Sequence, residues 1–295
     1  MGKILDKIAE GKVLVSDGAW GTFLHQKGLG ANECPELWNL NRPDEVLEIA
    51  ASYVKAGADI ILTNSFGGSP VKLAGYGLED QTYEINRAAA GISRKAAGNQ
   101  VLVLGSVGPT GKMVFMGEIS EEALMEGLKV QARGLADGGA DGILIETMSD
   151  LAEAELAIRA ARESTSLDVA CTFTFTKTLT GEYRTMMGTG VEEFMQMALR
   201  SGAGIVGANC GNGTAGMIEI VREIRAIDRK IPVLVHANAG LPVYRDGATV
   251  FPESPDEMAT QMKDLIAAGA NIVGGCCGTT PDHIRLIAEL INEGH

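Results

Sequence analysis

A single local pattern recurs along the whole chain: a helical segment ends in a turn of small residues, and a short apolar run follows it. Four such turns stand at residues 56–59, 138–141, 201–204 and 268–271. Glycine in these turns suits the end of a helix, because it adopts positive φ at little cost. The repetition predicts alternating helices and strands, and it constrains the fold more than any other feature of the sequence.

Eight apolar runs fit the strands of this pattern. They are rich in Val, Ile and Leu and alternate only weakly, as parallel strands covered on both faces do. These runs occupy residues 12–17, 60–66, 101–107, 142–148, 168–176, 205–210, 232–238 and 272–277. Helical periodicity is found at residues 43–55, 81–97, 120–137, 150–163, 191–200, 214–227, 254–268 and 281–292. Residues 18–42 are expected to form a loop with a short helix.

Eight strands that alternate with eight helices predict an α/β protein with the (β/α)8 TIM barrel fold. A doubly wound open sheet is the alternative arrangement of the same elements. No linker rich in Pro, Gly or Ser divides the chain, so residues 1–295 are expected to form a single domain. With 45% hydrophobic and 21% charged residues, the composition excludes a mainly disordered chain.

The net charge of −13 argues against a nucleic-acid partner, because proteins that bind nucleic acids present a basic face. No apolar run reaches the length of about 18 residues that a membrane span needs. The N-terminal segment lacks the apolar stretch of a signal peptide. Five cysteines, an odd number in a chain without an export signal, favour reduced thiols. We therefore expect a cytoplasmic protein with no nucleic-acid or membrane partner.

Polar residues collect at the carboxyl ends of the predicted strands, where TIM barrels place their active sites. These residues are Asp17, Asn64, Glu146, Asn209, Cys210, His236, Asn238, Cys276 and Cys277. None of the histidines has the spacing of a metal ligand, so His236 is expected beside a site rather than on a metal. Because barrel strands place these ends on one rim, the cluster predicts a functional site there.

Three of the five cysteines belong to this cluster. Cys210 ends the sixth strand, and Cys276 and Cys277 end the eighth, so their thiols can meet at the rim. Three thiolates suit Zn²⁺ and leave its fourth position open, as a catalytic zinc requires. The alternative is that they are small buried residues that pack like apolar side chains. The adjacent pair flanked by glycines favours the metal, whereas Cys34 and Cys171 are expected to be structural.

Two carboxylates and three amides in the cluster have two interpretations each. Asp17 and Glu146 can hold a cationic group such as a substrate ammonium, or they can cap a helix or pair with a loop lysine. Asn64, Asn209 and Asn238 can orient a substrate, or they can brace loops through bonds to the backbone. The residue types alone leave both interpretations open.

Several segments together resemble the homocysteine S-methyltransferase family. They are Asp17-Gly18-Ala19-Trp20-Gly21-Thr22, Glu36-Leu37-Trp38-Asn39, Thr63-Asn64-Ser65-Phe66-Gly67, Asn209-Cys210-Gly211, Asn238-Ala239-Gly240-Leu241-Pro242 and Gly274-Gly275-Cys276-Cys277-Gly278-Thr279-Thr280-Pro281. The match runs in order over essentially the whole chain. Within the family, the likeness is closest to the homocysteine-binding module of cobalamin-dependent methionine synthase.

The resemblance implies a zinc-dependent barrel enzyme that methylates homocysteine to methionine. It implies three zinc ligands: Cys210, Cys276 and Cys277. It makes Asp17 and Glu146 partners of the homocysteine ammonium, and it gives the backbone amides after Asp17, at about Ala19 and Trp20, to the carboxylate. Gly18 is expected among the substrate-binding residues beside them. The zinc-bound homocysteine thiolate would attack a methyl group of the donor.

The sequence departs from some relatives. Trp20 stands where a smaller or more flexible side chain is common, and the chain ends soon after the eighth helix. It is expected to lack the C-terminal extension of betaine-dependent enzymes and the cobalamin module of full-length methionine synthase. The methyl donor is therefore expected to bind the barrel directly or to arrive on another protein. The likeness favours a methylated corrinoid protein acting in trans, with S-methylmethionine and betaine as alternatives.

Three rival functions remain open at this point. A Schiff-base aldolase would need a lysine on a central strand, and the nearest candidates are Lys112 and Lys177, which follow strands three and five. A non-catalytic zinc protein would keep the metal without the reaction. A third possibility keeps the methyl transfer but uses another thiol as the acceptor.

Overall fold

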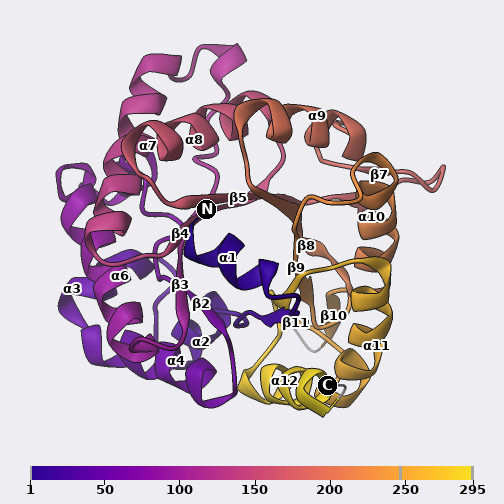
Figure 1. Cartoon of the computed structure of the whole chain (residues 1–295). Coiled ribbons are helices and arrows are strands. Elements are labelled where there is room, and N and C mark those ends of the chain that lie inside the picture. Colours follow the sequence, from indigo (N-terminus) through magenta and orange to yellow (C-terminus); the bar gives the residue numbers. More distant parts are fainter. Residues whose placement is uncertain (1, 246–247, 294–295) are drawn as a thin grey trace.

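In the computed structural model, which describes residues 2–245 and 248–293, eight parallel strands form a barrel ringed by helices (Figure 1). The strands are β1 (Leu14–Val15), β2 (Ile60–Leu62), β3 (Leu102–Val107), β4 (Gly142–Met148), β5 (Asp168–Phe173), β8 (Ile205–Gly213), β9 (Val233–Asn238) and β12 (Ile272–Gly275). Their hydrogen-bonded order is β1-β12-β9-β8-β5-β4-β3-β2, and a bridge between Ser16 and Ile60 joins the two ends of this sheet. The predicted TIM barrel is therefore confirmed, and the open doubly wound sheet is excluded.

Eight helices follow the strands and cover the outside of the barrel. They are α4 (Pro43–Lys55), α6 (Thr82–Ala97), α7 (Glu121–Asp137), α8 (Leu151–Ser164), α9 (Val191–Ser201), α10 (Thr214–Ile227), α11 (Pro255–Ala268) and α12 (Pro281–Glu293). Every bound agrees with its prediction to within one residue. The N-terminal bounds of three helices were predictable because Ser120, Asp150 and Ser254 are N-caps whose side chains accept a backbone N–H bond.

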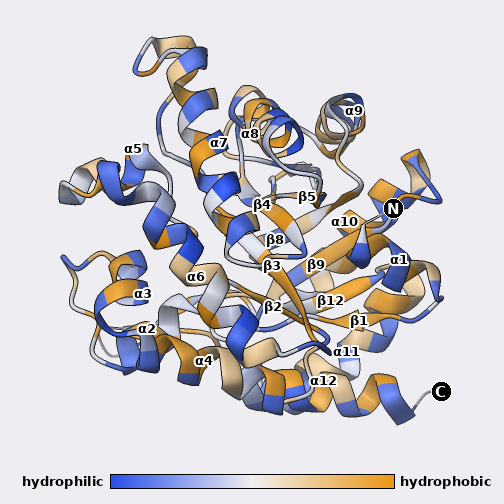
Figure 2. Ribbon diagram, turned by 60° about the vertical axis from the view of Figure 1, so that its left-hand side comes forward, coloured by the Kyte–Doolittle hydropathy of each residue, from blue (hydrophilic) through white to orange (hydrophobic). Residues whose placement is uncertain are grey.

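The barrel strands are mostly hydrophobic along their length (Figure 2). Their side chains are buried on both faces, in two separate clusters. The inner cluster fills the barrel near the amino ends of the strands. It consists of Ile4, Leu14, Ile60, Leu62, Leu104, Leu144, Ala170, Ile205, Leu234 and Ile272. Residues that alternate with these, such as Val15, Ile61 and Val103, belong to the larger cluster between strands and helices. This double burial explains why the sequence shows apolar runs instead of clean alternation.

A short N-terminal helix, α1 (Lys3–Ala9), was not predicted and lies across one end of the barrel (Figure 1). Ile4 is fully buried in the inner cluster. The Asp168 carboxylate at the start of β5 accepts the backbone N–H groups of Gly2, Ile4 and Leu5 at 3.1, 2.9 and 3.2 Å. With seven residues, α1 is too short to give a clear periodicity, so only tertiary contacts reveal that it closes the floor of the barrel.

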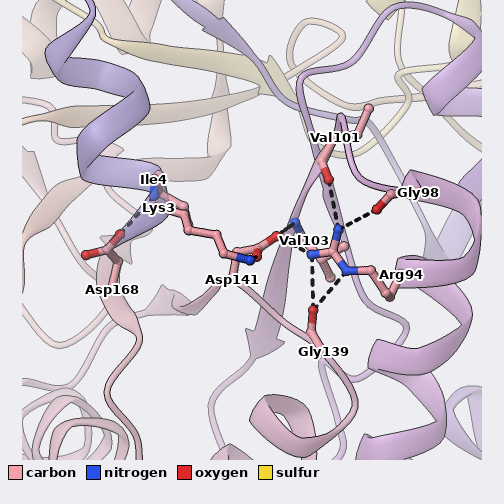
Figure 3. Close-up of polar contacts among 9 residues, drawn as sticks. All are labelled: Lys3, Ile4, Arg94, Gly98, Val101, Val103, Gly139, Asp141 and Asp168. Carbon is pink, nitrogen blue, oxygen red and sulfur yellow. Dashed lines mark hydrogen bonds and ion pairs between the residues drawn. The ribbon is translucent and has the colours of Figure 1, made fainter. Parts of the chain in front are cut away.

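Asp141 ties this floor to the barrel wall (Figure 3). Its carboxylate accepts from Lys3 Nζ at 2.7 Å, from the Val103 N–H at 2.9 Å and from the Arg94 guanidinium. Burial alone would raise the pKa of Asp141, but these donors outweigh it and hold the pKa below its ordinary value of 3.8. The carboxylate is therefore charged in the folded protein at neutral pH.

We expect Asp141→Asn to lower the free energy of unfolding by about 2 kcal/mol at neutral pH, because the buried donors lose a charged acceptor. Since the folded-state pKa is lowered, this stabilisation is present above the unfolded pKa and is lost as the pH falls through the folded one. Urea unfolding of both proteins at about pH 7 and about pH 3 measures this. Equal stability at pH 7 would contradict the assigned role.

Most irregular segments lie at the opposite end of the barrel, between a strand and the helix that follows it. They include α2 (Gly21–Gln26), α3 (Trp38–Asn41) and α5 (Pro70–Leu73), short 3₁₀ turns at Pro35–Leu37, Ala74–Tyr76, Glu79–Gln81 and Val114–Met116, and two hairpins, β6 (Thr176–Lys177) with β7 (Tyr183–Arg184) and β10 (Val243–Arg245) with β11 (Ala248–Val250). The predicted strands 60–66 and 168–176 were too long, because their last residues leave the sheet to enter these loops. Among the described helices, none has an apolar stretch long enough to cross a membrane.

Candidate active site and metal centre

The carboxyl ends of the strands surround a cavity of about 330 Å³. Nine residues expected from the sequence line it: Gly18, Ala19, Trp20, Asn64, Glu146, Cys210, His236, Cys276 and Cys277. Asp17, Asn209 and Asn238 are not part of the wall; each is buried and lies beside a residue of the site. The structure therefore brings the strand-end cluster together at one rim, as predicted.

The three cysteine sulfurs converge at this cavity. The Sγ atoms of Cys210 and Cys277 are 3.9 Å apart, and all three Sγ atoms lie within 4.8 Å of one another. The neighbouring strand β9 fixes the pair that follows β12, because Cys276 N–H donates to Ala237 and Cys277 O accepts from Ala239, at 2.7 and 3.0 Å. The backbone therefore holds the cluster in place.

This sulfur cluster fits Zn²⁺. Tetrahedral zinc with Zn–S bonds of about 2.3 Å places its sulfur ligands about 3.8 Å apart, close to the Cys210–Cys277 separation. All three cysteines are partly exposed, so a fourth ligand can reach the cluster from the cavity. Hydrogen bonds from the Cys276 and Cys277 thiols lower the pKa of Cys210, and the same contacts raise the pKa of both partner thiols. A site for a soft cation is the chemistry that these donors support.

The remaining two cysteines lie elsewhere. Cys171 is fully buried among the side chains between strands and helices, and burial raises the pKa of its thiol. Cys34 packs with Leu73 and Ile85 in a small separate cluster. Neither is part of the convergent group, in agreement with their expected structural role.

Asp17 is 1% exposed and keeps one oxygen free for a ligand. Its Oδ2 accepts from the Leu62 N–H and from the Trp20 indole N–H, both at 2.8 Å. Its Oδ1 has no hydrogen-bond partner among the described residues. Burial raises the pKa of Asp17 to about 7, although the two donors oppose this shift.

Glu146 lines the same cavity from the end of β4. Its Oε1 accepts a hydrogen bond from the Ser106 hydroxyl. Burial raises the pKa of Glu146 to about 7, and the nearby Cys210 adds to the shift while Ser106 opposes it. The charge of Glu146 also contributes to the raised pKa of Asp17, so the two carboxylates act on each other across the site.

Neither carboxylate has the structural role that was the alternative. Among the ion pairs of residues 2–245 and 248–293, none involves Asp17 or Glu146, and neither residue caps a helix. Two buried carboxyl groups without a protein cation are costly to ionise unless a cationic ligand joins them. This arrangement supports the interpretation that they hold a cationic group.

The amides have mixed surroundings. Asn64 lines the cavity while its Nδ2 braces the loop below it, donating to the Pro35 carbonyl at 2.8 Å. Asn238 hydrogen-bonds Cys210 and lowers the pKa of that thiol, and its buried Oδ1 has no partner in the described part of the chain. The Ala19 N–H already donates to Thr279 Oγ1 at 3.1 Å. Of the two amides expected for a carboxylate, this leaves the one at Trp20.

Two further wall residues, Ser106 and Thr147, line the cavity although no role was predicted for either. Thr147 stands beside Glu146 at the end of the fourth strand, whereas Ser106 lies inside an apolar run. Ser106 stands two positions after Leu104 on β3, so strand alternation places it on the inner face and could have identified it. His236 also lines the cavity; burial lowers its pKa to about 4, so the ring is neutral, and its Nε2 has no partner among the described residues.

Comparison with known proteins defines the family. The family model described as homocysteine S-methyltransferase matches residues 14–291. The chain belongs to the homocysteine S-methyltransferase family. The match includes the barrel strands and all three convergent cysteines, so the predicted family is confirmed.

Two curated relatives are similar to almost the whole of this chain. Methionine synthase of Mycobacterium leprae is 34% identical over 308 residues, which is 99% of this chain and 25% of the relative. Methionine synthase of Mycobacterium tuberculosis is 34% identical over 302 residues, with 98% of this chain and 25% of the relative covered. The chain thus spans about a quarter of the length of these relatives.

Solved structures agree with the family fold. The metallated form of the homocysteine methyltransferase MmuM from Escherichia coli superimposes with a TM-score of 0.76 and 23% identity, over 94% of this chain and 96% of that one. Its oxidised form gives a TM-score of 0.73 and 25% identity, over 94% and 95%. The barrel is therefore the fold of this methyltransferase family.

Proposed function

We propose that this protein transfers a methyl group to the sulfur of homocysteine and so forms methionine, with residues 1–295 acting as one catalytic unit. The observation that carries the proposal is a cavity lined by three convergent thiols and the Glu146 carboxylate, with the buried Asp17 carboxylate directly behind the wall residue Trp20; neither carboxylate pairs with a cation of the described residues. The three cysteines suit a metal ion that binds a thiol ligand, and the two carboxylates suit an ammonium group. Homocysteine carries both a thiol and an ammonium on one short chain.

The side chains divide the work of binding. Cys210, Cys276 and Cys277 would hold Zn²⁺, and a zinc ion bound there supplies a positive charge that favours the thiolate form of a thiol ligand. Asp17 and Glu146 bind the ammonium, each oriented by a donor from the protein. The Trp20 N–H is proposed to meet the carboxylate.

The methyl transfer itself requires no further catalytic group from the protein. The acceptor sulfur forms a bond to the methyl carbon while the bond between that carbon and the leaving group of the donor breaks. The thiol proton is lost to solvent before this step, so no protein base is required for the transfer. The cavity fixes the direction of the sulfur, and such positioning contributes up to about 7–11 kcal/mol in well-oriented reactions.

The structure disfavours a Schiff-base aldolase. No lysine of the described residues lines the cavity. Lys177 lies on the exposed β6–β7 hairpin and pairs with Glu219 at 2.6 Å. Lys112 is likewise exposed, in the loop after β3. An amine at either place is remote from the convergent side chains.

A methyl donor carried by another protein is favoured over a free onium compound. Large apolar side chains are exposed on the loops at the cavity end, in Phe115, Met116, Met186 and Tyr244. These side chains are available to contact a donor protein that docks at this end. Among the described wall residues the aromatic ones are Trp20 and Phe66, fewer than a cage for a quaternary ammonium normally uses. We therefore propose a methylated corrinoid protein as donor, in the cytoplasm, where the cluster thiols stay reduced.

A donor panel tests the proposed function. The purified zinc-loaded protein is incubated with homocysteine and, separately, methylcobalamin, S-methylmethionine or betaine, and methionine is measured. We expect methionine with methylcobalamin, at a rate that rises when a corrinoid protein carries the methyl group. Methionine formed from S-methylmethionine alone would keep the reaction and replace the donor. Absence of methionine with every donor, while another thiol is methylated, would overturn homocysteine as acceptor.

A further inference from the structure

Two strands of the barrel leave regular pairing at the same end. The register of β4 against β5 shifts between Ile145 and Met148, and that of β8 against β9 shifts between Asn209 and Gly213. Inside these irregular stretches lie Thr147 and Cys210, the two non-glycine residues of the described chain with positive φ, at 61° and 58°. The backbone of a non-glycine residue is strained in this conformation, and the conformation persists only where the surrounding structure holds it.

The side chain of Asn209 links the two stretches. Its Oδ1 accepts from the Thr147 N–H at 2.8 Å and from Thr172 Oγ1 at 2.7 Å. Its Nδ2 donates to Thr147 Oγ1 at 2.7 Å. Because β5 lies between β4 and β8 in the sheet, Asn209 reaches across one whole strand. Thr174 strengthens the crossing by donating to the Asn209 carbonyl at 2.9 Å.

These bonds engage both polar atoms of the Asn209 side chain within the protein. The residue is fully buried and does not line the cavity, and both polar atoms of its side chain are used by Thr147 and Thr172. The two residues with positive φ, however, belong to the proposed binding site or adjoin it. Thr147 follows Glu146 directly, and Cys210 follows Asn209 directly.

We propose that Asn209 is a positioning residue that sets the placement of Cys210 and of Glu146 together, through its paired hydrogen bonds with Thr147. Of the two roles that the sequence left open for Asn209, it therefore takes the bracing role and does not contact the substrate. The Glu146 half of this proposal rests on the proposed function, whereas the Cys210 half rests only on the convergence of the thiols. A single amide thus joins the metal-binding and ammonium-binding sides of the cavity.

The test removes the hydrogen bond between Asn209 Nδ2 and Thr147 Oγ1, once by changing the acceptor and once by changing the donor. Thr147→Val keeps the β-branched shape and removes the hydroxyl that accepts from Nδ2, and Asn209→Asp keeps Oδ1 and removes the donor. Thr147→Ser retains the hydroxyl and serves as the conservative variant. Asn86→Asp is a matched control, since Asn86 is another fully buried asparagine whose Nδ2 donates to backbone carbonyls, at Gly68 and Thr82.

Zinc affinity is measured by competition with a chelating dye in the absence of homocysteine, and KM and kcat for homocysteine are measured at saturating zinc. We expect Thr147→Val to weaken zinc binding about tenfold, the size of effect seen when groups that orient metal ligands are removed. KM for homocysteine rises severalfold in the same variant, and kcat changes less. Thr147→Ser restores both values, and Asn209→Asp combined with Thr147→Val is no worse than the more affected single variant, because both remove the same bond.

Three results would overturn the proposal. One is a folded Thr147→Val protein with unchanged zinc affinity and unchanged KM. The second is a change in one of these two readouts only, and the third is the same change in Asn86→Asp. If the unaltered protein binds zinc and forms no methionine, the proposed function fails, while the zinc measurement still decides whether Asn209 positions Cys210.

Discussion

Replacing Cys210, Cys276 or Cys277 by alanine is expected to abolish both zinc binding and methyl transfer. Two remaining sulfurs cannot form the three-ligand site, and zinc affinity depends steeply on the number of thiolates. Metal analysis of the purified proteins should fall from about one zinc per chain to well under a tenth. Methionine formation should fall to the background rate in the same samples.

Cys171→Ala is the matched control for these variants. Its thiol is fully buried between the strands and the helices, away from the cavity. This change leaves a small void and costs about 1 kcal/mol of stability, but zinc content and turnover stay as they were. A cluster variant that still carries one zinc per chain would show that its cysteine is not a ligand.

Asp17→Asn and Glu146→Gln are expected to weaken homocysteine binding and to leave the zinc content unchanged. Each variant loses a charged acceptor for the ammonium, worth about 1.5–3 kcal/mol, which corresponds to roughly a ten- to hundredfold rise in KM. Calorimetric titration of the zinc-loaded proteins with homocysteine checks this. The analogue 4-mercaptobutanoate, which lacks the amine, should bind both variants as well as it binds the unaltered protein.

The Asp17 carboxylate is expected to make homocysteine binding depend on pH. Burial raises the pKa of Asp17 to about 7 in the free protein, and the ammonium prefers the ionised form. Homocysteine binding should therefore weaken as the pH falls below about 7, and Asp17→Asn should make this part of the profile shallower, while Glu146, whose pKa is also raised to about 7, supplies the remaining dependence. Homocysteine affinity that stays unchanged in both variants would remove the ammonium role from Asp17 and Glu146.

The order of the elements could be predicted because each helix carries its own boundary signals. Ser120 and Ser254 cap their helices through local bonds that the sequence displays directly. The floor helix could not be predicted in this way. It is held by the Asp168 carboxylate, whose backbone partners are more than 160 positions away, and no local pattern encodes that contact.

The site was predictable to the extent that it follows strand ends. Cys210 and Cys277 meet because a barrel brings the sixth and eighth strands near one another, so their convergence followed from topology. Ser106 was missed because it sits inside an apolar run, although its alternation with Leu104 was visible. Asn209 was correctly placed near the site, but which groups its amide would bind depended on the two irregular strand ends.

The sealed floor has a kinetic consequence. Helix α1 and the packed inner cluster close the barrel at the amino ends of the strands. The acceptor and the donor must therefore both enter at the carboxyl ends, through the same opening. The molecule that sits deepest has to arrive first and depart last. Under the proposed function, homocysteine therefore enters an empty chamber, the donor follows it, and spent donor must withdraw before methionine can leave. Initial-rate measurements should accordingly show a compulsory sequence of binding, with excess donor slowing turnover by blocking the exit.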